Sequence, residues 1–470
     1  MALADLESQE RNADGIATAI GILKQRFGDR LQTNKSLLEQ HAHTMTYIPA
    51  QLPDAVVFPH STQEVQEVVR ICAEHRVPII PFGTGTSLEG AVNAPAGGIS
   101  VDMMQMNKIL SVNAEDLDVT LQPGVTRNEL NTHLRDQGLF FPIDPGADAS
   151  FGGMASTRAS GTNAVRYGTM RDNVINLTAV MPDGKVVKTG GRARKSSAGY
   201  DLTRLLVGSE GTLGIITELT LRLQGIPENI SSGVCQFPTV EDACNTTIAA
   251  MQVGLPLARI ELLDAVMVDA INKYSGLSYE LEPTLFLEFH GTDAGVAEQL
   301  QMFKDIASDF GGSDIQWVNT VEERNKLWKA RHDAYFGMLA YRPGSEGVAT
   351  DACVPISRLA ECISETMADV EELDLVVPIV GHVGDGNFHA TPLIMMDDAD
   401  ELARAEELIE RLNLRTIAMD GTCTGEHGIG QGKRRFLQLE HGSGAEVMAA
   451  IKRSIDPDNI MNPGKVVRLD

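Results

Sequence analysis

Residues 78–91 read PIIPFGTGTSLEGA, and this stretch predicts the fold more strongly than any other. The apolar residues 77–80 predict a buried strand that ends at Pro81. Gly83 and Gly85 follow, with hydroxyl residues beside them. Glycine allows positive φ and a close approach of backbone to ligand, and successive N–H groups in such a turn form a site suited to phosphate. An ordinary tight turn is the alternative for the loop alone.

The loop matches neither of the two common phosphate-binding motifs. A Walker loop ends in Gly-Lys-Ser/Thr, and none follows here. A dinucleotide fingerprint has the spacing GxGxxG, which Leu88-Glu89-Gly90 breaks. The loop therefore predicts a phosphate-bearing ligand on a fold outside the classical nucleotide-binding folds.

Composition excludes several function classes. The 470 residues suggest two to four domains, at roughly 100–200 residues each. A net charge of −25 argues against nucleic acid binding, which needs a basic face. Six cysteines without a CxxC pair fit a reducing compartment. The N-terminus resembles no signal peptide and no run of 18 apolar residues occurs. We expect a cytoplasmic protein without a transmembrane segment, with peripheral membrane attachment left open.

Two regions of different character follow the loop. Residues 142–168 are rich in Gly, Ala and Ser but also carry Asp, Arg, Asn and Tyr. A flexible linker is one interpretation, but a loop this long in a compact domain is usually functional. The glycines in 208–214 precede a strand and predict a second close backbone approach. After Pro227, short strands and helices alternate and indicate a separate α+β domain, with a helix over 320–342.

Residues 381–389, GHVGDGNFH, carry the strongest chemical pattern. A hairpin there would bring His382 and His389 together. Two imidazoles and a carboxylate are a common ligand set for a divalent transition metal, and Glu426 is the carboxylate candidate. Two structural histidines beside a turn are the alternative. His427 is a candidate base, because imidazole titrates near neutral pH, and Arg331 is a candidate clamp for a substrate carboxylate; a surface ion pair is its alternative.

The motifs resemble, in their order, the FAD-linked D-2-hydroxy acid dehydrogenases of the vanillyl-alcohol oxidase and p-cresol methylhydroxylase superfamily. They are PFGTGTSLEGA (81–91), DPGADASFGGMASTRASGTNAVRYG (144–168), GSEGTLGIITE (208–218), GHVGDGNFH (381–389), TCTGEHGIGQGKR (422–434) and NPGK (462–465). Residues 328–359 are most similar to the cytochrome-type D-lactate dehydrogenases.

The resemblance implies an α+β fold: a two-subdomain FAD-binding fold of the p-cresol methylhydroxylase type with an α+β cap. It implies a helical arm (1–50), an FAD-binding domain (51–227), a cap domain with substrate and metal sites (228–420), and a C-terminal segment returning to the flavin (421–470). FAD is expected to be non-covalent, since no residue matches a covalent flavin attachment site.

The family's functional residues carry over by motif. Metal ligands would be His382, His389 and Glu426, holding one zinc or manganese ion. His427 would be the base and would contact the substrate, and Arg331 would bind the substrate carboxylate. Arg342 lies near Ala349 in the sequence and is a further substrate candidate without a family match. FAD-binding residues would be Pro81, Phe82, Gly83, Thr84, Gly85, Thr86, Ser87, Pro145, Gly146, Ser150, Gly152, Gly153, Ala155, Ser156, Ser160, Gly161, Tyr167, Glu210, Gly211, Gly214, Ile215, Ile216 and Asn462.

The implied reaction is oxidation of a small D-2-hydroxy acid, with D-lactate preferred, and an external acceptor such as a quinone, a cytochrome or an electron-transfer flavoprotein. Ala349 stands where D-2-hydroxyglutarate dehydrogenases have a lysine, which disfavours that dicarboxylate, although nearby Arg342 could substitute. A glycolate-oxidising catalytic subunit and a non-catalytic flavin- or metal-binding scaffold are the other hypotheses.

Overall fold

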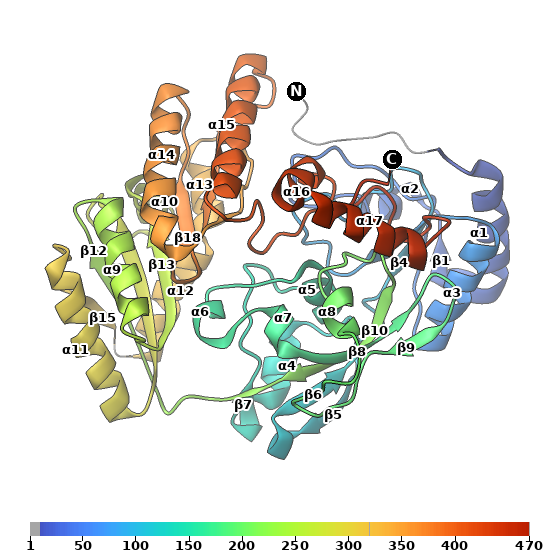
Figure 1. Ribbon diagram of the computed structural model, residues 1–470, viewed down its shortest axis with the longest axis horizontal. Coiled ribbons are helices and arrows are strands. Elements are labelled where there is room, and N and C mark those ends of the chain that lie inside the picture. The colour runs from blue at the N-terminus through green and yellow to red at the C-terminus, as the bar shows by residue number, and fades with distance from the viewer. Residues whose placement is uncertain (1–9, 319, 470) are drawn as a thin grey trace. The chain divides into compact units, whose positions relative to one another are not determined.

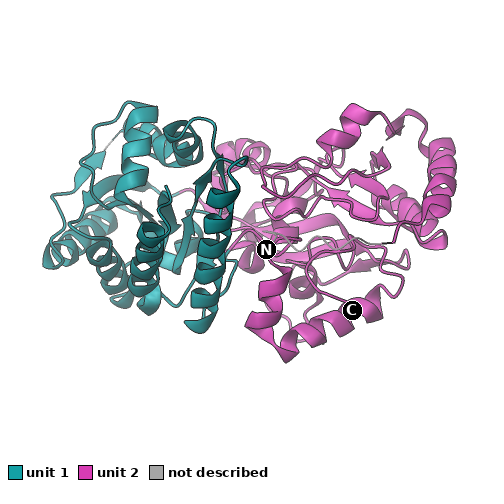
Figure 2. Ribbon diagram, turned by 90° about the horizontal axis from the view of Figure 1, so that it is seen from above, with its two compact units in different colours: residues 1, 161–167, 227–425 teal, residues 2–160, 168–226, 426–470 magenta. Residues whose placement is uncertain are grey.

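The computed structural model describes residues 10–318 and 320–469, which form two compact units. Unit 1 contains residues 161–167 and 227–425, and unit 2 contains residues up to 160, 168–226 and those from 426 onward (Figure 2). The fold is mixed, with 42% helix and 19% strand. Residues 1–9, the acidic N-terminal stretch of the sequence, lie outside the described residues.

The first sheet of unit 2 carries the glycine loop. Its order is β1-β2-β4-β3, with β4 parallel to β2 and β3. The strands are β1 (Leu31–Gln32), β2 (Ala55–Val57), β4 (Ile99–Asp102) and β3 (Ile79–Phe82). Helix α3 (Thr62–Glu74) connects β2 to β3 and begins where the Ser61 hydroxyl accepts the Glu64 N–H, as its capping pattern predicts.

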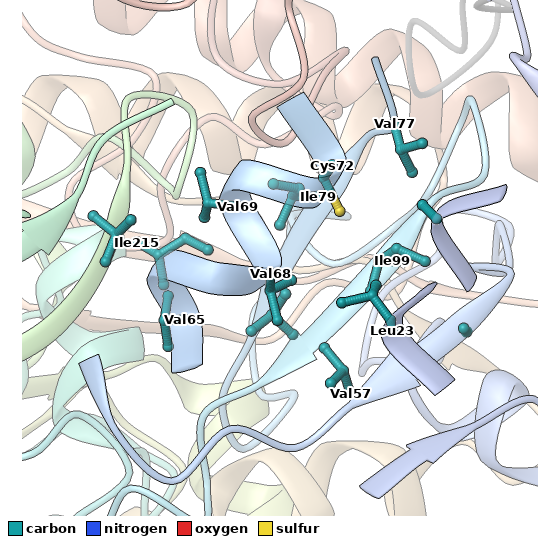
Figure 3. Close-up of a cluster of buried hydrophobic side chains, with 14 of the residues drawn as sticks. Leu23, Val57, Val65, Val68, Val69, Cys72, Val77, Ile79, Ile99 and Ile215 are labelled. Carbon is teal, nitrogen blue, oxygen red and sulfur yellow. The ribbon is translucent and has the colours of Figure 1, made fainter. Parts of the chain in front are cut away.

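Helices α3 and α1 (Ala13–Phe27) cover this sheet and form its core. Val65, Val68 and Cys72 lie on one face of α3, packed among strand residues such as Ile79 and Ile99 (Figure 3). Each fully buried valine contributes about 1.5–3 kcal/mol relative to exposure. The buried strand β3 is therefore a firm base for the loop that leaves its carboxyl end.

The second sheet of unit 2 is antiparallel, with the order β5-β6-β10-β8-β9. Its strands are β5 (Ile109–Asn113), β6 (Asp118–Leu121), β10 (Ile215–Arg222), β8 (Val174–Val180) and β9 (Val186–Lys188). Strands β8 and β9 form the hairpin expected from Pro182-Asp183-Gly184. A small pair joins β7 (Leu139–Phe140) to β11 (Gln224–Gly225).

Residues 142–168, expected to be a long loop, contain two short helices, α5 (Phe151–Thr157) and α6 (Ala164–Tyr167). Glycines at 152 and 153 give this stretch low helix propensity. Tertiary packing overrides it, because Phe151, Met154 and Ala155 are buried. A Cβ on Gly152 would lie 2.6 Å from Pro123 Cβ, so the glycine allows the helix to approach that backbone.

The other helices of unit 2 are short or terminal. They are α2 (Lys35–Gln40), α4 (Arg127–Leu134), α7 (Met170–Asn173), α8 (Leu202–Leu206), α16 (Arg434–His441) and α17 (Ser443–Ile455). The last two were not expected from the sequence. They precede the C-terminal segment whose backbone returns to the first sheet, where Asn462 N–H bonds to the Ile79 carbonyl at 2.8 Å.

Unit 1 is built on one sheet of seven strands in the order β15-β12-β14-β13-β18-β19-β17. They are β15 (Gln316–Val318), β12 (Asn229–Gln236), β14 (Thr284–Gly291), β13 (Leu257–Leu263), β18 (Ile379–His382), β19 (Asn387–Ala390) and β17 (Ala352–Cys353). A separate pair joins β16 (Glu346–Gly347) to β20 (Leu393–Ile394). All pairings in unit 1 are antiparallel.

Helices lie on both faces of this sheet (Figure 1). Helices α10 (Ala265–Ser275), α12 (Val321–His332) and α13 (Ala334–Tyr341) pack against one face through Trp328, Met267 and Met338. On the other, Phe303 of α11 (Asp293–Asp309) meets Phe289, with α9 (Val240–Gln252) beside it. The single helix expected over 320–342 is divided at Asp333, which ends α12 and begins α13.

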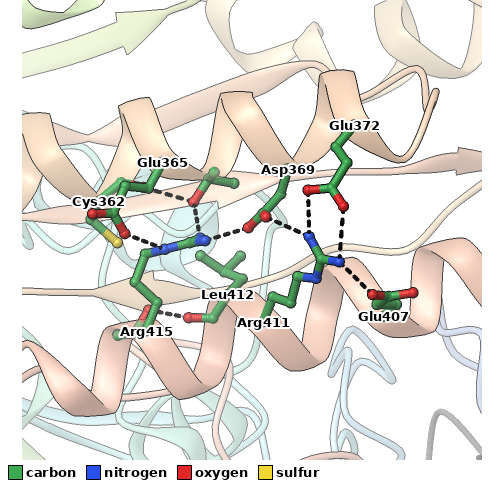
Figure 4. A network of polar contacts seen from close by, with 10 residues as sticks. Cys362, Glu365, Asp369, Glu372, Glu407, Arg411, Leu412 and Arg415 are labelled. Atoms are coloured by element: carbon green, nitrogen blue, oxygen red, sulfur yellow. Dashed lines mark hydrogen bonds and ion pairs between the residues drawn. The ribbon is translucent and has the colours of Figure 1, made fainter.

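The Glu and Arg residues at four-residue spacings in α15 (Ala399–Ala418) predict a helix that faces solvent with ion pairs of its own. The i,i+4 pair Glu407–Arg411 is present, but α14 (Leu359–Glu372), which was not expected, lies alongside. Arg411 also binds Asp369 and Glu372, and Arg415 binds Asp369 and Glu365 (Figure 4). These charged side chains therefore connect α15 to α14 and do not simply face solvent.

Candidate active site

The glycine loop leaves strand β3 of unit 2 and is half-buried. Gly85 has φ of +70°, and a Cβ there would lie 2.8 Å from Phe82 Cζ. The Thr84 and Thr86 hydroxyl oxygens are 3.3 Å apart. Because a side chain at Gly85 would be strained and would meet a ring, the turn depends on glycine.

Segments far apart in the sequence meet this loop within unit 2. A Cβ on Gly83 would lie 2.4 Å from the Ser150 hydroxyl, and one on Gly211 would lie 2.8 Å from Pro81 Cγ. The N–H of Glu210 bonds to the Ser156 carbonyl at 2.9 Å. Asn462 Nδ2 donates to the Glu210 carbonyl at 2.7 Å. Four separate sequence motifs thus form one cluster.

Three polar atoms of this cluster are suited to a polar ligand. Ser87 Oγ, Ser150 Oγ and Asn462 Oδ1 are buried, and none has a hydrogen-bond partner among the described residues. A buried polar atom without a partner is costly, and hydroxyl donors without charge suit a phosphate. These residues fit the pyrophosphate and ring edges of FAD.

Glu210 is a buried acid of this cluster. Its side-chain oxygens accept the N–H groups of Ile429 and Gly430 at 2.7 and 2.8 Å. Burial raises the pKa of Glu210 to about 7, against the lowering effect of these two bonds. The side chain therefore holds the segment next to His427, while its backbone belongs to the expected FAD-binding motif.

In unit 1 the two histidines come from one hairpin. Strands β18 and β19 pair with Val380 opposite His389 and His382 opposite Asn387. Residues two apart on facing strands share one face of a sheet. The imidazole rings of His382 and His389 are 5.6 Å apart, and each offers a nitrogen within 4.8 Å of the other. The hairpin predicted from the sequence is present.

Hydrogen bonds orient both rings. His382 Nδ1 lies 2.7 Å from Glu261 Oε1, and His389 Nδ1 lies 2.8 Å from the Thr350 carbonyl oxygen. Both partners are acceptors, so each Nδ1 carries the proton and the lone pair lies on Nε2. This tautomer, held by a carboxylate or a carbonyl, is the one in which metal-binding histidines are usually found.

Glu261 is the residue that sequence reasoning missed. It lies in β13, is fully buried, and also accepts Arg331 Nε at 3.0 Å and Nη2 at 2.5 Å. Burial acts to raise the pKa of Glu261, but its interactions with His382 and Arg331 outweigh burial and keep this pKa below the usual value. A glutamate inside the apolar run LARIELL was the available signal, because charged residues are rarely buried without a partner.

The segment leading to Glu426 runs beside the same sheet. Thr422 and Cys353 exchange two backbone hydrogen bonds at 2.8 and 3.1 Å, and Thr424 donates to Asp351. Gly425 N–H bonds to the Asp351 carbonyl at 3.3 Å. Gly425 is the last residue of unit 1, and Glu426 and His427 are the first two of the final stretch of unit 2.

Three expected site residues have other partners in unit 1. The Arg342 guanidinium pairs with Glu401 of α15. Gly161 and Tyr167 belong to unit 1, where the Tyr167 hydroxyl lies 2.8 Å from His290 Nδ1. The roles of these residues toward substrate or FAD stay predictions. The remaining FAD candidates, from 81–87, 145–160, 210–216 and Asn462, all lie in unit 2.

Family comparison agrees with this arrangement. The model of the C-terminal domain of FAD linked oxidases matches residues 226–466, and the model of an FAD binding domain matches residues 53–190. The chain belongs to the FAD-linked oxidases. The resemblance to FAD-linked D-2-hydroxy acid dehydrogenases is confirmed.

Curated relatives align with most of the length of this FAD-linked oxidase. It is 53% identical to a protein of Danio rerio named "Probable D-lactate dehydrogenase, mitochondrial", over 93% of this chain and 89% of the relative. It is 50% identical to "D-lactate dehydrogenase [cytochrome], mitochondrial" of Arabidopsis thaliana, over 88% and 74%. Among solved structures, p-cresol methylhydroxylase with substrate bound aligns over 97% of this chain and 98% of its own, at 18% identity and a TM-score of 0.79. The expected fold class is confirmed.

The names of the relatives correct one expectation. We expected a cytoplasmic protein, and this is wrong, since similar relatives are named mitochondrial. Neither the acidic N-terminal stretch nor the scattered cysteines can tell one reducing compartment from another. Among the described residues, every helix is too short or too polar to span a bilayer.

Proposed function

We propose that this flavoenzyme oxidises D-lactate to pyruvate, with the two electrons passing to FAD and then to an external acceptor. The observation that carries the proposal is the buried Arg331–Glu261–His382 group, in which one carboxylate contacts both an arginine and one of the two paired histidines. The relatives named D-lactate dehydrogenase support the choice of substrate.

The chain's residues divide the chemistry between them. Arg331 would bind the substrate carboxylate, since its guanidinium matches a carboxylate in a bidentate fashion. His382 and His389 would hold a divalent cation, zinc or manganese, with Glu426 as the third ligand. Glu426 follows Gly425 directly, and consecutive Cα atoms are only about 3.8 Å apart, so the position of Gly425 beside Asp351 supports this assignment.

The substrate hydroxyl must lose its proton during oxidation. A cation held there supplies Lewis acidity, which lowers the pKa of a bound hydroxyl, and FAD supplies the two-electron acceptor. His427 would take the hydroxyl proton at an imidazole nitrogen. Glu210 supports this role, because its carboxylate holds the backbone two and three residues beyond His427.

The FAD site is proposed in residues 51–227 together with 421–470, and the substrate and metal site in 228–420. The clustering of the glycine loop, residues 150–158, residues 208–211 and Asn462 supports the first assignment. The unfilled hydrogen-bonding capacity of Ser87, Ser150 and Asn462 supports non-covalent FAD there.

Anaerobic flavin reduction tests the reaction without knowledge of the acceptor. FAD- and metal-loaded protein is mixed in turn with D-lactate, L-lactate, glycolate and D-2-hydroxyglutarate, and loss of flavin absorbance is followed. Bleaching by D-lactate ahead of the others is expected. Faster bleaching by glycolate would move the assignment to a glycolate-oxidising subunit, and no bleaching by any acid would refute the proposal.

A cytochrome is the proposed acceptor, supported by the Arabidopsis relative named for one. D-lactate-dependent reduction of cytochrome c, measured beside reduction of a soluble quinone, tests this choice. Reduction of the quinone alone would reject the cytochrome and leave the lactate chemistry intact.

A further inference from the structure

Glu261 occupies a special position between two proposed functional groups. Its Oε2 accepts both Nε and Nη2 of Arg331, and its Oε1 faces His382 Nδ1 at 2.7 Å. The partners come from 70 and 121 residues away in the chain. One carboxylate in the middle of a strand thus serves an arginine from α12 and a histidine from β18.

The two contacts have different chemical consequences. On the histidine side, an accepting carboxylate keeps the proton on Nδ1 and the lone pair on Nε2, the state needed by a metal ligand. On the arginine side, Oε2 uses Nε and one hydrogen of Nη2. A guanidinium has five N–H donors, so the three on Nη1 and Nη2 that remain lie along its outer end, in the arrangement that matches a second carboxylate.

We propose that Glu261 is a positioning residue that serves the metal site and the substrate-carboxylate site at once. This inference rests on the proposed function. It predicts that loss of Glu261 weakens two separate properties, the affinity for a divalent cation and the affinity for the substrate. A carboxylate that only stabilised the sheet would affect neither property in correctly folded protein.

The neighbouring strand offers a matched control. Glu288 of β14 is also buried and also contacts a histidine and an arginine: Oε1 lies 2.8 Å from His290 Nε2 and 3.6 Å from Arg259 Nε. Neither partner is a proposed metal ligand or substrate residue. Glu261→Gln and Glu288→Gln therefore remove the same charge from two buried Glu–His–Arg groups of one sheet.

The glutamine variant is informative at Glu261. If its amide oxygen stays with Arg331, its NH₂ group faces His382 Nδ1. That nitrogen must then accept, which moves the imidazole proton to Nε2 and removes the lone pair that a metal needs. Loss of the carboxylate from a histidine ligand typically lowers metal affinity by about 10–100-fold.

The experiment titrates Mn²⁺ and Zn²⁺ into chelator-treated, FAD-loaded protein by calorimetry, and measures KM for D-lactate at saturating metal. For Glu261→Gln we expect a metal Kd raised about 10–100-fold and a raised KM. Glu288→Gln is expected to keep the wild-type metal Kd. Wild-type metal affinity in Glu261→Gln, with FAD content intact, overturns the inference.

Two further measurements complete the test. If Glu261→Gln does not fold, Glu261→Asp keeps the buried charge on a shorter side chain that reaches one partner only. Either the metal Kd or KM then rises, and a variant with both values unchanged overturns the inference. Wild-type protein that binds neither cation would instead overturn the metal role in the proposed function, and this inference with it.

Discussion

Two buried glutamates, one in each unit, show how the same side chain serves different chemistry. Glu210 of unit 2 accepts two backbone N–H groups, and burial raises its pKa to about 7. Glu261 of unit 1 is just as buried but faces Arg331 and His382, and its pKa stays below the usual value. For Glu210 the two backbone N–H groups and Lys465 do not offset burial, to which Glu89 adds, whereas for Glu261 the interactions with His382 and Arg331 do offset it.

The difference matches the proposed tasks of the two regions. The site in unit 2 is made of glycines, hydroxyls and backbone groups, which suits a cofactor that brings its own negative charge. The proposed site in unit 1 combines two imidazoles with a charged glutamate–arginine pair, which suits a metal ion and a small carboxylate. Substitutions in unit 1 should therefore mainly change ligand binding. Substitutions in unit 2 should mainly change the pH dependence of stability and the backbone geometry.

The largest effect is expected from Arg331→Lys. Lysine keeps the charge beside Glu261 but loses the planar fork that binds a carboxylate in a bidentate fashion. Weakening a buried, hydrogen-bonded charge contact typically costs about 2–5 kcal/mol, so kcat/KM for D-lactate should fall about 100-fold or more. Stopped-flow flavin reduction at varied D-lactate measures this.

The matched control is Arg324→Lys on the same helix, where Arg324 donates to the Ile230 carbonyl. It should keep kcat/KM near the wild-type value. An equal loss in both variants would mean that helix α12, rather than the contact with substrate, is responsible.

The second largest effect concerns pH. Because the folded pKa of Glu210 is about 7 and the ordinary glutamate value is 4.5, its contribution to stability is complete below pH 4.5 and is lost as pH rises through 7. The wild type should lose up to about 3 kcal/mol relative to Glu210→Gln between pH 5 and 8. Urea unfolding across this range measures the difference.

The pKa of Glu288 is shifted in the opposite direction from that of Glu210, so Glu288 serves as a comparison. Its pKa is lowered to about 2 although burial acts to raise it, because Arg259 and His290 favour the charged form. Its stabilisation is present above pH 4.5 and is lost only as pH falls toward 2, so the difference between wild type and Glu288→Gln should be flat from pH 5 to 8. A flat Glu210 profile would contradict the contrast between the two sites.

A smaller effect is expected at the glycine loop. Gly85→Ala places a Cβ at φ of +70° and 2.8 Å from the Phe82 ring. Left-handed geometry costs a non-glycine residue about 1–2 kcal/mol, so FAD affinity should fall about tenfold, measured by fluorescence titration of apoprotein. Gly138→Ala has a similar φ of +67° in open space away from the loop and should leave FAD affinity unchanged.

The smallest effect should come from the charges between α14 and α15. Arg411 is only partly buried, with 32% of its side chain exposed, and ion pairs near the surface contribute little because water and salt screen them. Arg411→Met should change the unfolding midpoint less than Arg415→Met, since Arg415 and Asp369 are largely shielded from solvent. Thermal unfolding in low and high salt compares them, and a larger effect of Arg411 would reject this ranking.

Much of the fold was predictable because its signals are local. Helix α3 begins at the cap formed by Ser61, β8 and β9 join at a Pro-Asp-Gly turn, and the hairpin with His382 and His389 follows from a glycine-rich turn between apolar strands. Helix α5 was missed because its glycines give the segment a low helix propensity. Helix α14 was missed because its amphipathic pattern was not interpreted as a helix. The break at Asp333 was missed because both sides of it read as helix.

The sequence by itself determined the family, the glycine loop and the histidine pair, because each is encoded by residues that are neighbours along the chain. Only the tertiary structure decided which carboxylate orients which group. Glu261 meets Arg331 and His382, and Glu210 meets the segment at 429–430, across separations of 70 to 220 residues. Such contacts depend on how strands pair and helices pack, and a buried charge must find its partner wherever the fold places one.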